Sequence, residues 1–179
     1  MSTTKGKLVW VDLEMTGLNP EKDKIVEIAT LVTDASLDVL AEGPSLVIYQ
    51  PPLVLDNMND WCQEHFAESG LLNSIHDSKI SLAEAEDQTL NFLKIHCQPQ
   101  TALFAGNSVH IDYEFIRLQM PKLADFMHYR IIDVSTIKEL ALRWYPSTPA
   151  FPKVEPHRAK DDILESIDEL KYFKARIFK

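Results

Sequence analysis

Near the start of the chain lies the stretch VDLEMTG (residues 11–17), in which two acidic residues interrupt an otherwise apolar run. Apolar and β-branched residues at positions 8–13 predict a strand. Residues two apart on a strand point to the same face, so Asp12 and Glu14 project together. Two like charges buried side by side are costly unless a metal or a proton compensates them. Such a pair also occurs at the exposed end of a strand, so these two residues alone leave a metal role open.

Two more strands are expected after this stretch. Residues 25–33 and 46–49 are rich in apolar and β-branched types, and residues 39–42 offer an earlier start for the third strand. Turn signals at residues 19–20 and 34–38 separate the three segments. Short turns join antiparallel neighbours, so the first part of the chain is expected to form an antiparallel meander.

Helices and strands alternate in the rest of the sequence. A capping-box pattern at residues 81–84 precedes a helical repeat of apolar residues. Pro121 ends one expected helix, and Ser135 is expected to cap another. The expected helices cover residues 60–65, 82–96, 112–120, 135–144 and 160–178, and the expected strands cover residues 101–105 and 129–134. This order predicts an α/β fold in which an antiparallel meander is followed by parallel strands, with helices on both faces of the mixed sheet.

The composition limits the class of protein. With 179 residues, of which 45% are hydrophobic, the chain is long enough to bury a core as a single domain spanning residues 1–179. Its formal net charge of −9 argues against wrapping long duplex nucleic acid, because that affinity comes from many Lys and Arg contacts. Cys62 and Cys97 match neither a zinc spacing nor a disulfide framework.

No segment of the sequence predicts a membrane anchor or a secretory signal. No apolar run approaches the roughly 20 residues that span a bilayer, and the N-terminal residues 1–7 are mostly polar. We therefore expect a cytoplasmic protein without membrane contact. A transit peptide removed from the chain would also allow a mitochondrial location.

Two later segments carry further acidic residues next to expected helix starts. Asp112 follows a buried strand and lies near the first turn of its helix, where compensation of the helix dipole is the alternative role. His157 precedes Asp161 and Asp162, which lie in the first turn of the last helix. The alternative for this segment is again capping by the acids, with a solvated histidine.

Together the three segments predict a site that hydrolyses phosphodiester bonds. Two divalent ions in such a site activate a water molecule and stabilise the leaving oxygen, and several carboxylates must hold them. Oxygen ligands suit Mg²⁺ or Mn²⁺ rather than zinc, and four acids supply them: Asp12, Glu14, Asp112 and Asp162. His157, with an ordinary pKa of about 6.5, is the expected general base near neutral pH.

The order of these residues, D-x-E, a mid-chain aspartate and H-x-x-x-x-D, resembles the DEDDh class of 3′→5′ exonucleases. Within that class, the chain is similar to the oligoribonuclease family from residue 8 to about residue 179. The motifs that carry the similarity are VDLEMTGL (11–18), GNS (106–108), HYR (128–130), DVST (133–136) and DDI (161–163). The resemblance implies a ribonuclease H-like fold and the hydrolysis of short oligoribonucleotides, especially dinucleotides, to 5′-mononucleotides.

The resemblance also implies roles for individual residues. The catalytic metal ligands would be the four acids already named, Asp12, Glu14, Asp112 and Asp162. His157 would be the general base, and Asp161 would be a neighbouring acid that does not bind the metal. The cofactors implied are two divalent ions, Mg²⁺ or Mn²⁺.

A substrate site that measures length is implied as well. Leu18 and Trp61 would pack against the bases, since apolar and aromatic platforms accept any base. Ser108, Arg130 and Ser135 would hold the 5′ phosphate through charge-assisted hydrogen bonds. Without the resemblance, simpler roles are favoured, which are an apolar turn residue, a core tryptophan, a surface charge and a helix cap.

Tyr129 would reach across a homodimer interface into the partner's site, whereas a tyrosine at a strand end is otherwise usually half-buried. Two positions depart from the family pattern. A histidine expected in place of Phe66 appears one residue earlier, as His65, and a helix turns by about 100° per residue, so a phosphate role for His65 is left open. Lys160 replaces the usual apolar residue, where it either tunes the site or faces water.

Overall fold

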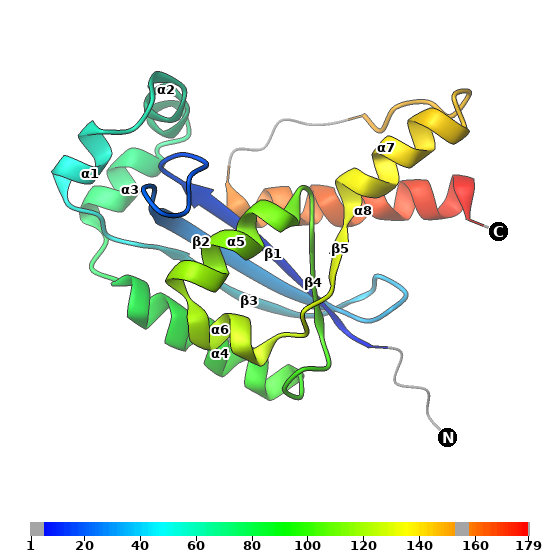
Figure 1. Cartoon of the computed structure of the whole chain (residues 1–179), viewed down its shortest axis with the longest axis horizontal. Helices are drawn as coiled ribbons and strands as arrows, with labels where there is room; N and C mark the ends of the chain where they lie inside the picture. The colour runs from blue at the N-terminus through cyan, green and yellow to red at the C-terminus, as the bar shows by residue number, and fades with distance from the viewer. Residues whose placement is uncertain (1–5, 153–157, 179) are drawn as a thin grey trace.

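A five-stranded sheet lies at the centre of the computed structural model, which describes residues 6–152 and 158–178 (Figure 1). Its strands are β1 (Leu8–Met15), β2 (Ile25–Thr33), β3 (Val39–Val47), β4 (Leu103–Gly106) and β5 (Ile131–Asp133). The order across the sheet is β3-β2-β1-β4-β5. The first three strands pair antiparallel, and β4 pairs parallel with both β1 and β5. The expected α/β fold, a meander followed by parallel strands, is therefore confirmed.

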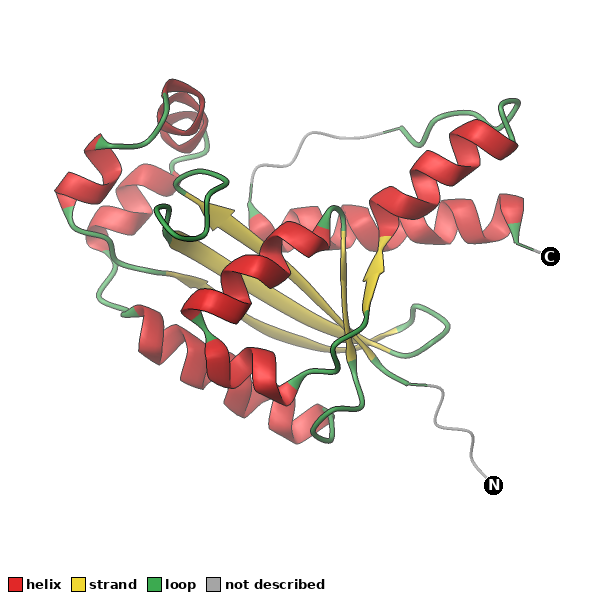
Figure 2. Cartoon of the chain, viewed as in Figure 1, coloured by secondary structure: helices red, strands yellow, loops and turns green. Residues whose placement is uncertain are grey.

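Helices cover both faces of this sheet, as expected (Figure 2). They are α1 (Pro52–Asp56), α2 (Asp60–Glu68), α3 (Leu71–Asp77), α4 (Leu82–His96), α5 (Val109–Gln119), α6 (Pro121–Phe126), α7 (Val134–Trp144) and α8 (Ala159–Ile177). In Figure 1, α4, α5 and α6 lie over one face of the sheet and α8 lies over the other. Among the described residues, no helix combines the length and the apolar character that crossing a bilayer requires.

The two faces of β1 belong to different cores. Val9 and Leu13 are buried in the core formed with α4, α5 and α6, whereas Trp10 is buried on the opposite face, in the core formed with α8. Because alternate residues of a strand point to opposite faces, Asp12 and Glu14 continue the side of Trp10. The two carboxylates thus lie on the face of the sheet that α8 covers.

Three short helices were not expected, and local backbone chemistry explains each of them. Pro52 and Pro121 occupy the first turns of α1 and α6, where a helix tolerates proline because no amide hydrogen is needed. Pro121 therefore ends one helix and begins another. The third, α3, follows Gly70, whose φ of 72° lies in the left-handed region that glycine enters freely.

Two details of the expected elements are corrected. The third strand begins at Val39, so the earlier start is right, and Tyr49 lies beyond its end. Ser135 does not cap α7. The N-cap is Asp133, whose carboxylate accepts a hydrogen bond of 2.9 Å from the backbone N–H of Ser135. A carboxylate at the end of β5 is a good acceptor for the unpaired amides of the first turn, so it takes the capping position.

The buried carboxylate of Glu86 joins α4 to α6. It is only 5% exposed, and one of its oxygens accepts hydrogen bonds from the backbone N–H groups of Lys122 (2.7 Å) and Leu123 (3.2 Å). These two amides belong to the first turn of α6, which has no carbonyl partner for them within the helix. Glu86 therefore acts as an N-terminal cap supplied by a different helix.

We expect Glu86→Ala to lower the free energy of unfolding by about 1–3 kcal/mol, because two backbone amides, of which that of Leu123 is buried, lose their acceptor. The control is Asp87→Ala, which removes an exposed ion pair with Lys122 and should change stability by less than about 1 kcal/mol. Urea unfolding of both variants measures the difference. Equal losses would contradict the capping role of Glu86.

Candidate active site

Three carboxylates meet at the carboxyl end of β1. Asp12 and Glu14 come from β1, and Asp162 comes from the first turn of α8. One oxygen of each lies within 4.8 Å of the other two, and all three side chains are half-buried. The structure thus brings together three of the four predicted metal ligands from segments about 150 residues apart.

Asp112 contacts the backbone of the same strand. It lies in the first turn of α5, is 6% exposed, and accepts a hydrogen bond of 2.9 Å from the backbone N–H of Leu13. Leu13 lies between Asp12 and Glu14, so this bond fixes Asp112 next to the pair. The charge of Asp112 also raises the pKa of Asp12, so the two carboxylates act on each other directly.

Burial raises the pKa values of Asp12, Glu14 and Asp112, and repulsion from neighbouring carboxylates adds to it. Burial, followed by the charge of Asp162, raises the pKa of Glu14 to about 8. Burial raises the pKa of Asp112 to about 7. Burial, followed by the charges of Asp112 and Glu14, raises the pKa of Asp12 well above its usual range. Close carboxylates that resist ionisation need either protons or a cation, and their hard oxygen atoms suit a divalent one.

The predicted general base, His157, lies outside the described residues. The described chain resumes at Arg158, which is the N-cap of α8. The expected role of His157 therefore stays a prediction from the sequence.

An ion pair that was not expected lies beside the cluster. Glu27 is fully buried on β2, directly opposite Glu14 in the register of β1 and β2. Its two oxygens accept hydrogen bonds from Arg158, at 2.9 Å from Nη2 and 3.2 Å from Nε. The available signal was a glutamate inside the apolar segment 25–33, because a charge in a buried strand needs a partner.

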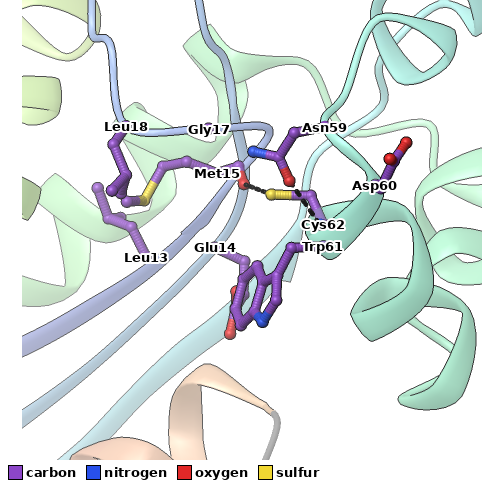
Figure 3. A pocket seen from close by; sticks show the side chains of 9 residues that line it. All are labelled: Leu13, Glu14, Met15, Gly17, Leu18, Asn59, Asp60, Trp61 and Cys62. Carbon is purple, nitrogen blue, oxygen red and sulfur yellow. Dashed lines mark hydrogen bonds between the residues drawn. The ribbon is translucent and has the colours of Figure 1, made fainter.

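An apolar pocket opens next to Glu14 (Figure 3). Its volume is about 740 Å³, and it is lined by residues of β1, the following turn and the start of α2, which are Leu13, Glu14, Met15, Gly17, Leu18, Asn59, Asp60, Trp61 and Cys62. Leu18 is 73% exposed and Trp61 is 64% exposed. Trp61 is therefore not a core residue, and both side chains are accessible from solvent at the mouth of the site.

His65, which precedes the position where the family pattern has a histidine, stacks on Trp61 of this pocket and does not occupy the place of Phe66. Phe66 is 1% exposed and belongs to the core beneath α2. The ring of His65 stacks on that of Trp61, with centroids 4.5 Å apart and planes 18° apart. Since the two lie four residues apart on α2, they share one face of the helix.

The two predicted phosphate-binding serines meet at the ends of β4 and β5. The Oγ atoms of Ser108 and Ser135 are 3.0 Å apart, and the backbone N–H of Ser108 donates to Ser135 Oγ at 2.7 Å and to Asp133 at 3.0 Å. Ser108 adopts the left-handed conformation, with φ of 51°. A non-glycine residue held in this region is often found at functional sites.

Arg130 and Tyr129 lie just before β5, at the opposite end of that strand from the two serines. Tyr129 is 67% exposed, stacks on His128, and has the Arg130 guanidinium carbon 5.4 Å from its ring centroid. The structure therefore does not bring Arg130 together with Ser108 and Ser135. The exposure of Tyr129 contradicts the alternative of a half-buried core residue.

A buried polar network supports the serine pair. Asn107 Nδ2 donates to Glu169 at 2.8 Å and to Ser166 Oγ at 3.0 Å, while its Oδ1 accepts from Ser135 Oγ at 3.2 Å. Glu169 is 1% exposed on α8. This network links α8 to the loop that presents Ser108, and the sequence analysis had not predicted the part of Ser166 and Glu169 in it.

Comparison with known proteins gives the family. The model of a family described as exonuclease matches residues 9–170. The chain is 51% identical over 175 residues to the mitochondrial oligoribonuclease of Mus musculus, which covers 97% of this chain and 74% of that relative. It is 50% identical over 180 residues to the oligoribonuclease of Haemophilus influenzae, with 100% of this chain and 99% of the relative covered.

Solved structures of low identity share the fold. Exonuclease I of E. coli matches with a TM-score of 0.72 at 15% identity, and that of Methylocaldum szegediense with a TM-score of 0.71 at 16% identity. Each match covers 97% of this chain but 41% of the larger protein. The likeness concerns the fold alone and confirms the ribonuclease H-like expectation. With about half of its residues identical to those of oligoribonucleases over nearly its whole length, the chain belongs to the oligoribonuclease family of exonucleases.

Proposed function

We propose that this chain is a 3′→5′ exoribonuclease that hydrolyses short oligoribonucleotides, dinucleotides above all, to 5′-mononucleotides, and that residues 1–179 form a single exonuclease domain. The observation that carries the proposal is the carboxylate cluster at the end of β1, in which oxygens of Asp12, Glu14 and Asp162 lie within 4.8 Å of one another and the pKa values of Asp12 and Glu14 are raised. Membership of the oligoribonuclease family supports the class of substrate.

The acids of the cluster fit two divalent ions, Mg²⁺ or Mn²⁺, because both prefer carboxylate oxygens. The residues that would hold the ions are Asp12, Glu14, Asp112 and Asp162. When bound, such ions neutralise charge on the reacting phosphate and lower the pKa of water. The chain contributes rigidity, since β1 carries Asp12 and Glu14, and the Leu13 amide holds Asp112 in place.

His157 would accept the proton of the attacking water at its unprotonated ring nitrogen. Its place in the sequence, five residues before Asp162, supports this role. A histidine with an ordinary pKa of about 6.5 is largely neutral at pH 7.5 and can act as a base there.

The substrate would lie across the apolar pocket beside Glu14. Leu18 and Trp61, both exposed at its mouth, would stack against the bases without selecting among them. The hydroxyl groups of Ser108 and Ser135 would hold the 5′ phosphate. Arg130 would contribute its guanidinium group only from a second copy of the chain, because within one chain it lies at the opposite end of β5. A strand longer than a few nucleotides would lack a terminal phosphate at this distance.

A homodimer would complete the site. Tyr129 is 67% exposed and lies with Arg130 at the far end of β5 from the serine pair. Residues presented outward in this way can serve the site of a second copy, in which Tyr129 would approach the substrate. A cytoplasmic or mitochondrial location stays a prediction from the sequence.

Turnover of a short RNA tests the role of the carboxylate cluster. With Mn²⁺ or Mg²⁺, the native chain should release mononucleotides from a 5′-phosphorylated RNA dinucleotide. Asp162→Asn should lower kcat on the order of 100-fold or more, because the loss of a ligand removes several kcal/mol of charge stabilisation. The matched control is Asp161→Asn, which changes the exposed neighbouring acid and should stay within about twofold. Full activity in Asp162→Asn would overturn the proposed role of the cluster.

Dependence on substrate length tests the proposed site for the terminal phosphate. Ser135→Ala should lower kcat/KM for a 5′-phosphorylated dinucleotide about tenfold, the value of one charge-assisted hydrogen bond. The same change should have little effect on a 20-nucleotide RNA. Thr136→Ala, which removes the adjacent exposed hydroxyl, is the control. A native enzyme that hydrolyses two-, five- and twenty-nucleotide substrates at equal rates would instead indicate a nuclease for longer strands.

The stability of the metal-free protein should depend on the protonation of Glu14. The pKa of Glu14 is about 8 in the folded protein, whereas an unfolded glutamate titrates near about 4.3. The folded state therefore binds more protons between these values. The stability that this group contributes is complete below about pH 4 and is lost as the pH rises through about 8.

In EDTA, the Tm of the native chain should fall as the pH rises from 6 to 9, and Glu14→Gln should lose several degrees less over the same range. Glu21→Gln, which alters an exposed glutamate in the turn after β1, should follow the native curve. Circular dichroism melts at each pH provide the measurement. Parallel curves for the native chain and Glu14→Gln would show that Glu14 is not strained.

A further inference from the structure

The pair formed by Glu27 and Arg158 adds a fifth carboxylate to a place that already holds too much negative charge. Glu27 is 0% exposed and shares a face of the sheet with Glu14, its cross-strand neighbour. Its charge raises the pKa values of both Asp12 and Glu14. For stability alone, well-packed apolar residues in place of both Glu27 and Arg158 would serve about as well, because a buried ion pair often fails to repay its desolvation.

Several hydrogen bonds fix the orientation of the Arg158 side chain against Glu27. Arg158 contacts both carboxylate oxygens of Glu27, through Nη2 at 2.9 Å and Nε at 3.2 Å. The hydroxyl of Ser45 on β3 donates to the same carboxylate at 3.3 Å. Two parallel N–H···O bonds fix the plane of the guanidinium group as well as its distance, which a single contact does not.

The Glu27–Arg158 ion pair holds the beginning of α8. The carbonyl of Arg158 accepts hydrogen bonds from the backbone N–H groups of Asp161 (2.8 Å) and Asp162 (3.2 Å). The side chain of Arg158 makes no capping hydrogen bond to this helix end, because it is turned to Glu27 instead. Through the two backbone bonds to its carbonyl, the position of Asp162 against β1 is linked to where Arg158 is held.

We propose that Glu27 and Arg158 are positioning residues, which set the distance of Asp162 from Asp12 and Glu14 and so control cation binding and turnover. The inference rests on the proposed function for the role of the cluster. It goes beyond that function in assigning a task to two residues that do not themselves bind metal or substrate.

A second ion pair from the same turn of α8 offers a matched comparison. Lys160 Nζ lies 2.8 Å from a carboxylate oxygen of Glu42 on β3, so this pair also ties α8 to the sheet. Both of its side chains are about half exposed, at 49% and 58%, and the contact is a single one. Exposed pairs of this kind hold little against solvent and salt.

The test compares Arg158→Lys, Glu27→Gln and the double variant Glu27→Gln/Arg158→Lys with Glu42→Gln as control. Arg158→Lys keeps the charge but removes the two-point contact. Three quantities are measured: amide hydrogen exchange of residues 158–165 in EDTA, Mn²⁺ affinity by calorimetry, and kcat and KM on a 5′-phosphorylated RNA dinucleotide. The first two do not require activity.

We expect faster exchange in residues 158–165, a Mn²⁺ Kd raised about tenfold and a kcat lowered about tenfold in Arg158→Lys, the size of effect seen when residues that orient metal ligands are changed. KM should stay within about twofold, since neither residue lines the base pocket. The double variant should be no worse than the single ones, because the pair acts as one unit. Glu42→Gln should match the native chain in all three measurements.

The proposal is overturned if Arg158→Lys lowers only Tm while exchange, Mn²⁺ affinity and kcat remain those of Glu42→Gln. If Glu27→Gln fails to fold, the conservative Arg158→Lys decides alone. If the native chain cleaves no RNA, the proposed function fails, yet hydrogen exchange and Mn²⁺ affinity still test the positioning role of the Glu27–Arg158 ion pair. The two failures can therefore be told apart.

Discussion

Repulsion among carboxylates at the end of β1 is the constraint on which the rest of this structure depends. Asp12, Glu14 and Asp162 place oxygens within 4.8 Å of one another, and Asp112 is bonded to the backbone of Leu13 between the first two. Left to themselves, such groups would separate or stay protonated. A stiff scaffold is therefore needed, and the central strand of the sheet, paired on both edges, provides it.

The scaffold divides its work between the two faces of β1. One face carries a large apolar core with α4, α5 and α6, which gives the sheet its rigidity. The other face carries the acids and a smaller core with α8, which brings Asp162 into place. The ion pair between Glu27 and Arg158 connects the start of α8 to the sheet. Stability and chemistry thus use opposite sides of one strand.

Local patterns predicted much of the fold, and the failures have identifiable causes. The segments 25–33 and 82–96 were predicted with their observed ends, because each combines a strong apolar period with clear boundaries. The short helices α1, α3 and α6 were missed, since their few residues carry too little periodicity to distinguish them from loops. For Trp61, hydrophobicity alone favoured a core position, and only the resemblance to the family pointed to the accessible position that the structure shows.

The sequence by itself singled out the acids that the structure brings together, and it determined that Asp12 and Glu14 share a face, because the two-residue period of a strand is a local property. It did not determine which distant groups meet them. The contact of Arg158 with Glu27 joins residues 131 apart, and that of Asp112 with Leu13 joins residues 99 apart. Only the tertiary structure decided these pairings, because they depend on how α5 and α8 pack on opposite faces of the sheet.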